Sequence, residues 1–160
     1  MSYSIDPNDV KDDLLPEGSY VVRIRGCGYG TTKGKGTPYQ RIKGLIMAGP
    51  IDKLTDVNDA QPRSESLNCD LWLTEGCRTQ NARALAACAV TGPVDLANND
   101  ATHTALVGAT VVWVLKHEEY NGNVSAKVAF WNRPADAVLR AFADERTPKA
   151  KPLTDDTLPF

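Results

Sequence analysis

Hydrophobic and polar residues alternate along three segments in the first half of the chain. This period of two is typical of half-buried β-strands. The first strand begins at Gly18, and we predict the second over residues 38–47 and the third over residues 64–73. Residues 26–37 contain five glycines and no aliphatic side chain. They predict a flexible loop between the first two strands.

The hydrophobic period changes after the third strand. Residues 74–90 are rich in alanine and carry apolar residues at helical spacing, so they predict a helix. A polar connection over residues 91–107 leads into two more strands, over residues 109–120 and 123–131. The Asn121-Gly122 pair between these strands predicts a hairpin turn.

The order of these elements predicts the fold class and the domain organisation. Five strands with a helix between the third and fourth are the layout of an OB-fold barrel, although other small five-stranded sheets remain possible. Pro134 starts a short C-terminal helix. A length of 160 residues fits one compact domain. We therefore expect a mostly β protein with three parts: an acidic arm over residues 1–17, an OB-fold domain over 18–146, and a disordered linker with an acidic tip over 147–160.

Charge is unevenly distributed, although the net charge is only −2. Residues 1–17 hold five acids and one base, whereas residues 18–48 hold six bases and no acid. This asymmetry favours an anionic partner for the middle of the chain. No apolar run approaches the ~20 residues of a membrane span, and the polar start does not resemble a signal peptide. We expect a soluble, cytoplasmic protein with no membrane partner.

The sequence does not favour a metal, a cofactor or catalysis. The four cysteines show no C-x-x-C spacing, so we expect reduced thiols and no zinc site. The glycine-rich loop fits neither the phosphate-binding P-loop pattern nor G-x-G-x-x-G. Glu118 and Glu119 are adjacent on a strand and therefore point to opposite faces. With two histidines and no supporting motif, no nucleophile triad can be proposed.

Basic and aromatic residues instead predict a surface for single-stranded DNA. OB-folds bind single strands across the second and third strands and with neighbouring loops. Cations contact phosphates, and each ring stacked on a base contributes ~1–3 kcal/mol. The expected DNA-binding residues are Arg23, Arg25, Tyr29, Lys33, Lys35, Tyr39, Arg41, Lys43, Trp72, Tyr120, Lys127 and Trp131. The alternative is that the bases form a solvated face and the aromatics are core, as we expect for Trp113.

The last six residues, DDTLPF, form a second candidate site. A terminal phenylalanine beside acids makes a portable peptide ligand, because the ring fills a pocket and the carboxylates meet a basic rim. This tip resembles the acidic Pro-Phe tip of bacterial single-stranded-DNA-binding proteins, which docks replication and repair enzymes. The matching residues are Asp155, Asp156, Leu158, Pro159 and Phe160. Thr157 interrupts the acidic run that is usual in that family.

The body of the chain is similar to a group of phage-encoded proteins of the same kind. The similarity lies in four short motifs: the start at Gly18, Tyr20, Val22 and Ile24, the Thr32-Lys33 loop, the Trp72 strand and the Glu118–Gly122 hairpin. It implies a non-enzymatic protein in the host cytoplasm that binds and protects single-stranded DNA with little sequence preference during replication, recombination and repair. It also implies recruitment of partner enzymes through the tip, and homo-oligomers are possible. Two alternatives stay open: a recombination mediator that anneals strands, and a protein-interaction or virion module that binds no DNA.

Overall fold

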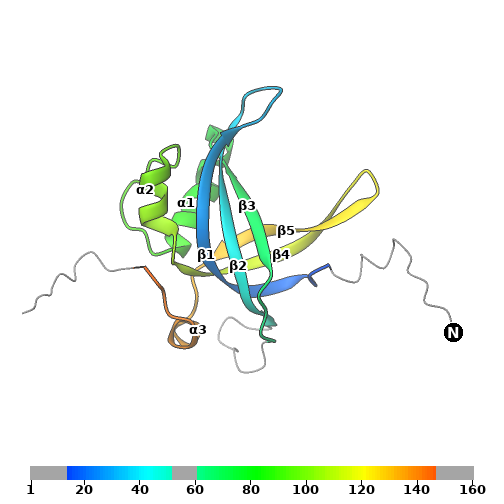
Figure 1. Ribbon diagram of the computed structural model, residues 1–160, viewed down its shortest axis with the longest axis vertical. Coiled ribbons are helices and arrows are strands. Elements are labelled where there is room, and N and C mark those ends of the chain that lie inside the picture. Colours follow the sequence, from blue (N-terminus) through cyan, green and yellow to red (C-terminus); the bar gives the residue numbers. More distant parts are fainter. Residues whose placement is uncertain (1–13, 52–60, 147–160) are drawn as a thin grey trace, which may run out of the picture.

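The computed structural model describes residues 14–51 and 61–146. Five antiparallel strands form one sheet in the order β3-β2-β1-β4-β5, which confirms the mostly β prediction (Figure 1). The strands are β1 (Gly18–Thr31), β2 (Pro38–Ile51), β3 (Ser66–Trp72), β4 (Thr110–Tyr120) and β5 (Asn123–Asn132).

The sheet does not close into the predicted barrel. In the described residues, β3 pairs with β2 alone, and β5 pairs with β4 alone. The short β3 leads through a 3-10 turn, η2 (Glu75–Cys77), into α1 (Arg78–Ala87), which packs against β5. A side-chain contact bridges the two edge strands, because the Trp131 indole Nε1–H donates to Cys69 Sγ at 3.4 Å. We call the space between β3 and β5 the seam.

β1 extends further than its hydrophobic pattern predicts. Its pairing with β2 continues to Thr31, so residues 26–31 belong to the strand rather than to a loop. Only residues 32–37 connect the two strands. The pairing places the glycines of this stretch directly beside β2.

A second helix, α2 (Asn99–Leu106), lies where we predicted only a polar connection. The Asn98 side chain accepts a hydrogen bond from the Ala101 N–H at 2.9 Å and so caps the helix. Thr102 and Leu106, one turn apart, are its buried residues. The helix spans only eight residues, so few positions repeat along its buried face and the sequence pattern does not reveal it.

The other two helices are shorter than their predictions. The predicted helix over residues 74–90 becomes η2 followed by α1, and Thr74 makes no side-chain capping hydrogen bond. The C-terminal helix is α3 (Asp136–Ala141). No helix in the described residues is both long and apolar enough to cross a membrane.

The main core lies between the inner face of the sheet and helices α1 and α2. Tyr20, Ile42 and Trp113 are fully buried there. Gly44 is part of this packing, because a Cβ at that position would lie 2.5 Å from the Trp113 ring. On the outer face, α3 covers the start of β1 through a small second cluster centred on Val138. The outer face of β2 and β3 beyond this cluster stays exposed.

Candidate nucleic-acid interface

The outer face of β1 carries glycines where it lies beside the basic face of β2. Residues directly opposite in an antiparallel pair point to the same face of the sheet. Gly26, Gly28 and Gly30 are opposite the three predicted binding residues of β2, which are Lys43, Arg41 and Tyr39 respectively. This part of β1 therefore presents bare backbone next to two cations and a ring. We call the resulting shallow hollow the glycine groove; it is lined by residues 26–29, Tyr39, Arg41, Lys43 and Asn68.

The glycines of the groove have different roles. Gly28 has no heavy atom within 4 Å of the place where a Cβ would lie, and its φ is not positive. Neither packing nor backbone conformation therefore requires glycine there. Gly30 is different, because a Cβ there would lie 2.7 Å from the Tyr39 hydroxyl oxygen. The Tyr39 ring lies over Gly30, and a larger residue would displace it.

Two aromatic rings lie side by side at one end of the groove. Tyr39 and Trp72 are cross-strand partners on β2 and β3, with ring centroids 5.5 Å apart and planes at 66°. Trp72 is 38% exposed, and the Arg41 guanidinium lies 5.3 Å from the Tyr39 centroid. Tyr39, Arg41, Lys43 and Trp72 therefore share one face of the sheet, as the alternation of residues along β2 and β3 predicts.

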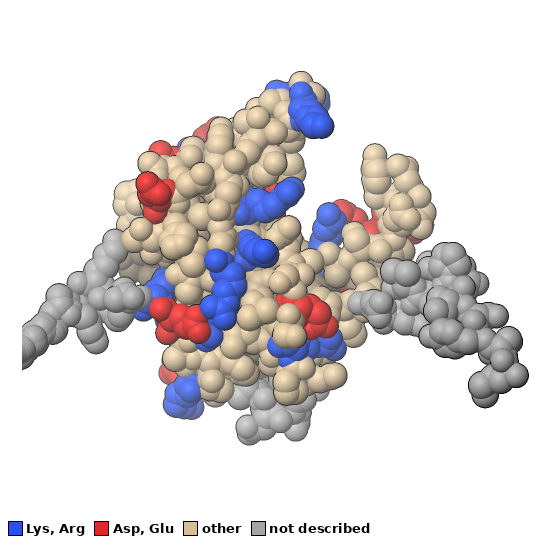
Figure 2. Space-filling view, in the orientation of Figure 1, with Lys and Arg blue, Asp and Glu red and all other residues tan. Residues whose placement is uncertain are grey.

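The cations of this face differ in how far they are already paired. Arg41 donates two hydrogen bonds to the Asp70 carboxylate, at 2.8 and 3.0 Å. These bonds, and the charge of Asp70, raise the pKa of Arg41 above its ordinary value. Lys33, Lys35 and Lys43 form no ion pair with any described residue. Figure 2 shows basic side chains in a broken line from the tip of the β1–β2 loop down the sheet.

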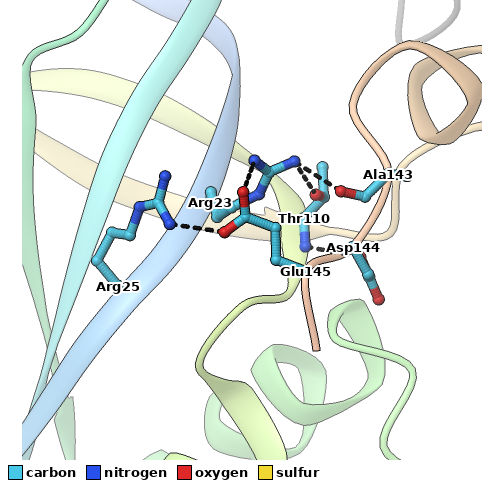
Figure 3. Close-up of polar contacts among 6 residues, drawn as sticks. All are labelled: Arg23, Arg25, Thr110, Ala143, Asp144 and Glu145. Atoms are coloured by element: carbon cyan, nitrogen blue, oxygen red, sulfur yellow. Dashed lines mark hydrogen bonds and ion pairs between the residues drawn. The ribbon is translucent and has the colours of Figure 1, made fainter. Parts of the chain in front are cut away.

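Arg23 and Arg25 are held by residues 143–146, which we call the C-terminal strap (Figure 3). Glu145 accepts from the Arg23 Nη1 at 2.8 Å and from the Arg25 Nη1 at 2.7 Å. Arg23 also donates to the Ala143 carbonyl at 2.6 Å, and its side chain is only 8% exposed. The structure therefore places Arg23 beneath the strap and away from solvent, while Arg25 is exposed but paired.

Backbone and side-chain bonds attach the strap to the rest of the fold. The Glu145 N–H donates to the Gly108 carbonyl at 2.7 Å, and the Asp144 carboxylate accepts from the Thr110 N–H at 2.8 Å. Arg146 donates to the carbonyl oxygens of Cys88 and Ala105, at 2.6 and 2.9 Å. The strap thus connects β1 and β4 with the C-terminal ends of α1 and α2.

The side chains of the remaining predicted binding residues on the strands lie away from the glycine groove. Tyr29 is opposite the buried Gln40, so its side chain lies on the other face of the sheet from Tyr39. Tyr120 is 76% exposed at the end of the β4–β5 hairpin, which extends away from the body in Figure 1, and Lys127 is exposed on the same hairpin. Trp131 points inward, with its ring centroid 5.3 Å from that of Trp113.

Some residues of the site were not predicted from the sequence. Asn68 lines the groove, and Gln40 positions the segment before α2 by donating to the Leu96 carbonyl at 2.8 Å. The glycines of β1 line the groove as strand residues, whereas their composition predicts a loop. Their spacing of two along the chain is the signal that identifies them as one face of a strand.

Two of the cysteines are buried thiols of low reactivity. All four are free, and burial raises the pKa of Cys69 to about 11 and that of Cys88 to about 12. Both thiols therefore stay protonated at neutral pH and are poor nucleophiles. No group of three or more His, Cys, Asp or Glu side chains within the described ranges could hold a metal ion.

Two predicted features lie outside the described residues. They are most of the acidic arm, residues 1–13, and the linker with its tip, residues 147–160. Neither a model of a known protein family nor a curated protein matches the chain.

Replacing Glu145 with glutamine should destabilise the fold. The change leaves the buried Arg23 guanidinium without its carboxylate, and an unpaired buried charge costs about 1–3 kcal/mol or more. Urea denaturation should show this loss. Glu75→Gln is the control, because Glu75 forms an ion pair of the same kind with Arg78 on an exposed surface. If both variants unfold like the original chain, the strap does not stabilise the sheet through this pair.

Proposed function

We propose that the protein binds single-stranded DNA, without catalysis and with little sequence preference, along the glycine groove and the adjacent Tyr39–Trp72 pair. The alternation of glycines on β1 opposite Tyr39, Arg41 and Lys43 is the observation that carries this proposal. Bare strand backbone lets a flexible polymer approach the sheet closely. The neighbouring cations meet its phosphates, and the exposed rings stack on its bases.

The exposed Trp72 ring and the half-buried Tyr39 ring favour an unpaired strand over a duplex. Bases in a duplex stack on one another, whereas those of a single strand can stack on Tyr39 and Trp72. Stacking is largely independent of sequence because every base has an aromatic face. We further propose that the sheet is an open form of the OB-fold, a fold that binds oligonucleotides on the face of its second and third strands. The resemblance to bacterial and phage-encoded single-stranded-DNA-binding proteins supports this function in replication, recombination and repair.

The proposal includes recruitment of partner enzymes through residues 155–160. Its support is the sequence of the tip, in which Asp155 and Asp156 precede Pro159 and Phe160. An aromatic ring with nearby acids suits a pocket with a basic rim. DNA binding and recruitment are then carried out by different parts of the chain.

Replacing Gly28 with valine should block the groove without harming the fold. A Cβ at this position meets no heavy atom within 4 Å, and a strand backbone without a positive φ suits a β-branched residue, so the fold should tolerate the change. The isopropyl group would occupy the floor on which the DNA lies. Fluorescence anisotropy with labelled oligo-dT should show at least about tenfold weaker binding, a loss of about 1.4 kcal/mol.

Gly92→Val provides the matched control for this substitution. Gly92 also has open space around its Cβ position and no positive φ, but it lies outside the groove. This variant should bind oligo-dT like the original chain. Equal affinities for all three proteins would contradict the groove as the binding surface. Absence of binding by the original chain at low salt would contradict single-strand binding itself.

Replacing Asp70 with asparagine should strengthen DNA binding. The change removes a negative charge beside the groove and releases the Arg41 guanidinium from its carboxylate partner. Each further phosphate that the protein neutralises should steepen the slope of log K against log salt by about 0.7. A salt series of oligo-dT titrations measures both effects, with Glu75→Gln as a control away from the groove. An affinity equal to or below that of the original chain would show that Arg41 contacts no phosphate.

Replacing Phe160 with alanine should separate recruitment from DNA binding. The ring that fills the partner's pocket is lost, while the groove is untouched. Replication and repair enzymes that co-purify with the original chain from bacterial cells should be absent from the variant, as measured by mass spectrometry. Affinity for oligo-dT should be the same in both. Co-purification of the same enzymes with the variant would rule out the tip as their docking site.

A further inference from the structure

The open seam between β3 and β5 contains a pocket of about 430 Å³. Residues of both edge strands line it, together with residues of η2 and α1. This volume falls within the ~300–1,000 Å³ typical of sites for small ligands. The pocket lies between the two edge strands, and there is room for it because these strands do not pair with each other.

Strand alternation gives this pocket an aromatic rim and an aromatic floor. Trp72 and Phe130 belong to the outer faces of β3 and β5, and they are 38% and 54% exposed. Trp131 belongs to the inner face, where its indole N–H is bonded to Cys69 Sγ. Trp131 packs against Trp113 of the core, whereas the Phe130 ring is largely exposed to solvent and has no such packing role. We define the seam pocket by these residues together with Asn81 and Arg83 of α1.

Polar groups complete the pocket on the sides of β3 and α1. Asn81 Nδ2 donates to the Trp72 carbonyl at 2.8 Å, so this carbonyl points away from β2 and into the seam. Alternate residues of an antiparallel strand direct their backbone groups to the same side. The N–H and C=O of Asp70 therefore also point toward the seam. Arg83 forms no ion pair with any described residue and adds a cation.

We propose that the seam pocket takes one unstacked nucleobase of the strand that lies in the glycine groove. This inference rests on the proposed function and adds a specific base subsite to it. Trp72 connects the two surfaces, since its ring contacts Tyr39 at the groove and also lines the pocket. A strand that crosses the edge of β3 passes over this ring. Its next base then meets Phe130, while Arg83 is available to a neighbouring phosphate.

The shape of the seam favours a flat ring over an added β-strand. An inserted peptide strand would need a continuous row of free backbone groups along β3. The Trp72 carbonyl already accepts a hydrogen bond from Asn81, and the Trp131–Cys69 contact bridges the seam. A single planar base needs only the space between the rings and one or two hydrogen-bonding groups. Amide side chains and backbone groups offer both donors and acceptors to its edge.

The test combines a substitution with a crosslink. Phe130→Ala removes an exposed ring, so it should not disturb folding; Val124→Ala truncates an exposed residue of the same strand outside the pocket. Loss of one stacked base should weaken oligo-dT binding by about 5- to 150-fold in Phe130→Ala. Val124→Ala should bind like the original chain. An oligonucleotide that contains 5-iodouracil should, on irradiation, crosslink to the peptide that holds Phe130 and Trp131.

The outcomes separate this inference from the proposed function. Weaker binding by Phe130→Ala alone, with a crosslink on β5, supports the base subsite. Unchanged affinity of Phe130→Ala, or crosslinks confined to β1 and β2, overturns the base subsite but leaves the proposal of DNA binding in the glycine groove intact. Equal losses in Phe130→Ala and Val124→Ala also overturn it, because the effect would then not be specific to the pocket. If the original chain binds no oligonucleotide, the proposed function fails, and the subsite fails with it.

Discussion

Hydrogen bonding along β1 holds the whole sheet together, because this strand pairs with β4 and β2 in its first half and with β2 alone in its second half. In the first half, residues 18–23 lie between two neighbouring strands, and the side chains of residues 20–23 are buried on both faces. In the second half, one edge of the strand meets α2, where the Tyr29 N–H donates to Asn99 Oδ1 at 2.9 Å. The outer face of that half is bare. The same strand therefore stabilises the core at one end and forms the floor of the candidate binding surface at the other.

The C-terminal strap determines where positive charge remains available on this face. Glu145 pairs with both Arg23 and Arg25, so it offsets one of their two charges and fixes both side chains. Asp70 offsets the charge of Arg41. Lys33, Lys35 and Lys43 pair with no described carboxylate, so their charges stay fully available. An anionic ligand is therefore attracted to the distal half of the β1–β2 hairpin, which is the half that contains the glycines.

Local alternation predicted that five segments are strands, and it predicted the faces of the β2 and β3 side chains. It placed Tyr39, Arg41, Lys43 and Trp72 together correctly, because the side chains of a strand alternate by geometry alone. It did not predict the burial of Arg23, because its partner Glu145 lies 122 residues away along the chain. Barrel closure also depends on long-range pairing, and in the described residues only the Trp131–Cys69 side-chain contact bridges the unpaired edges of β3 and β5. The glycine-rich end of β1 has the composition of a loop, and only the spacing of its glycines indicates a strand.

The open space at Gly28 also affects how amino-acid substitutions at this position change stability and binding. Glycine within a strand costs about 0.5–1 kcal/mol relative to alanine, through the freedom it loses on folding. Folding itself does not require glycine at this position, because packing and backbone conformation accept a larger residue. The chain therefore gives up stability where the DNA is proposed to lie. Under the proposed function, selection for folding and selection for binding act in opposite directions at this position, so the most stable variant of this sheet would not bind DNA most tightly.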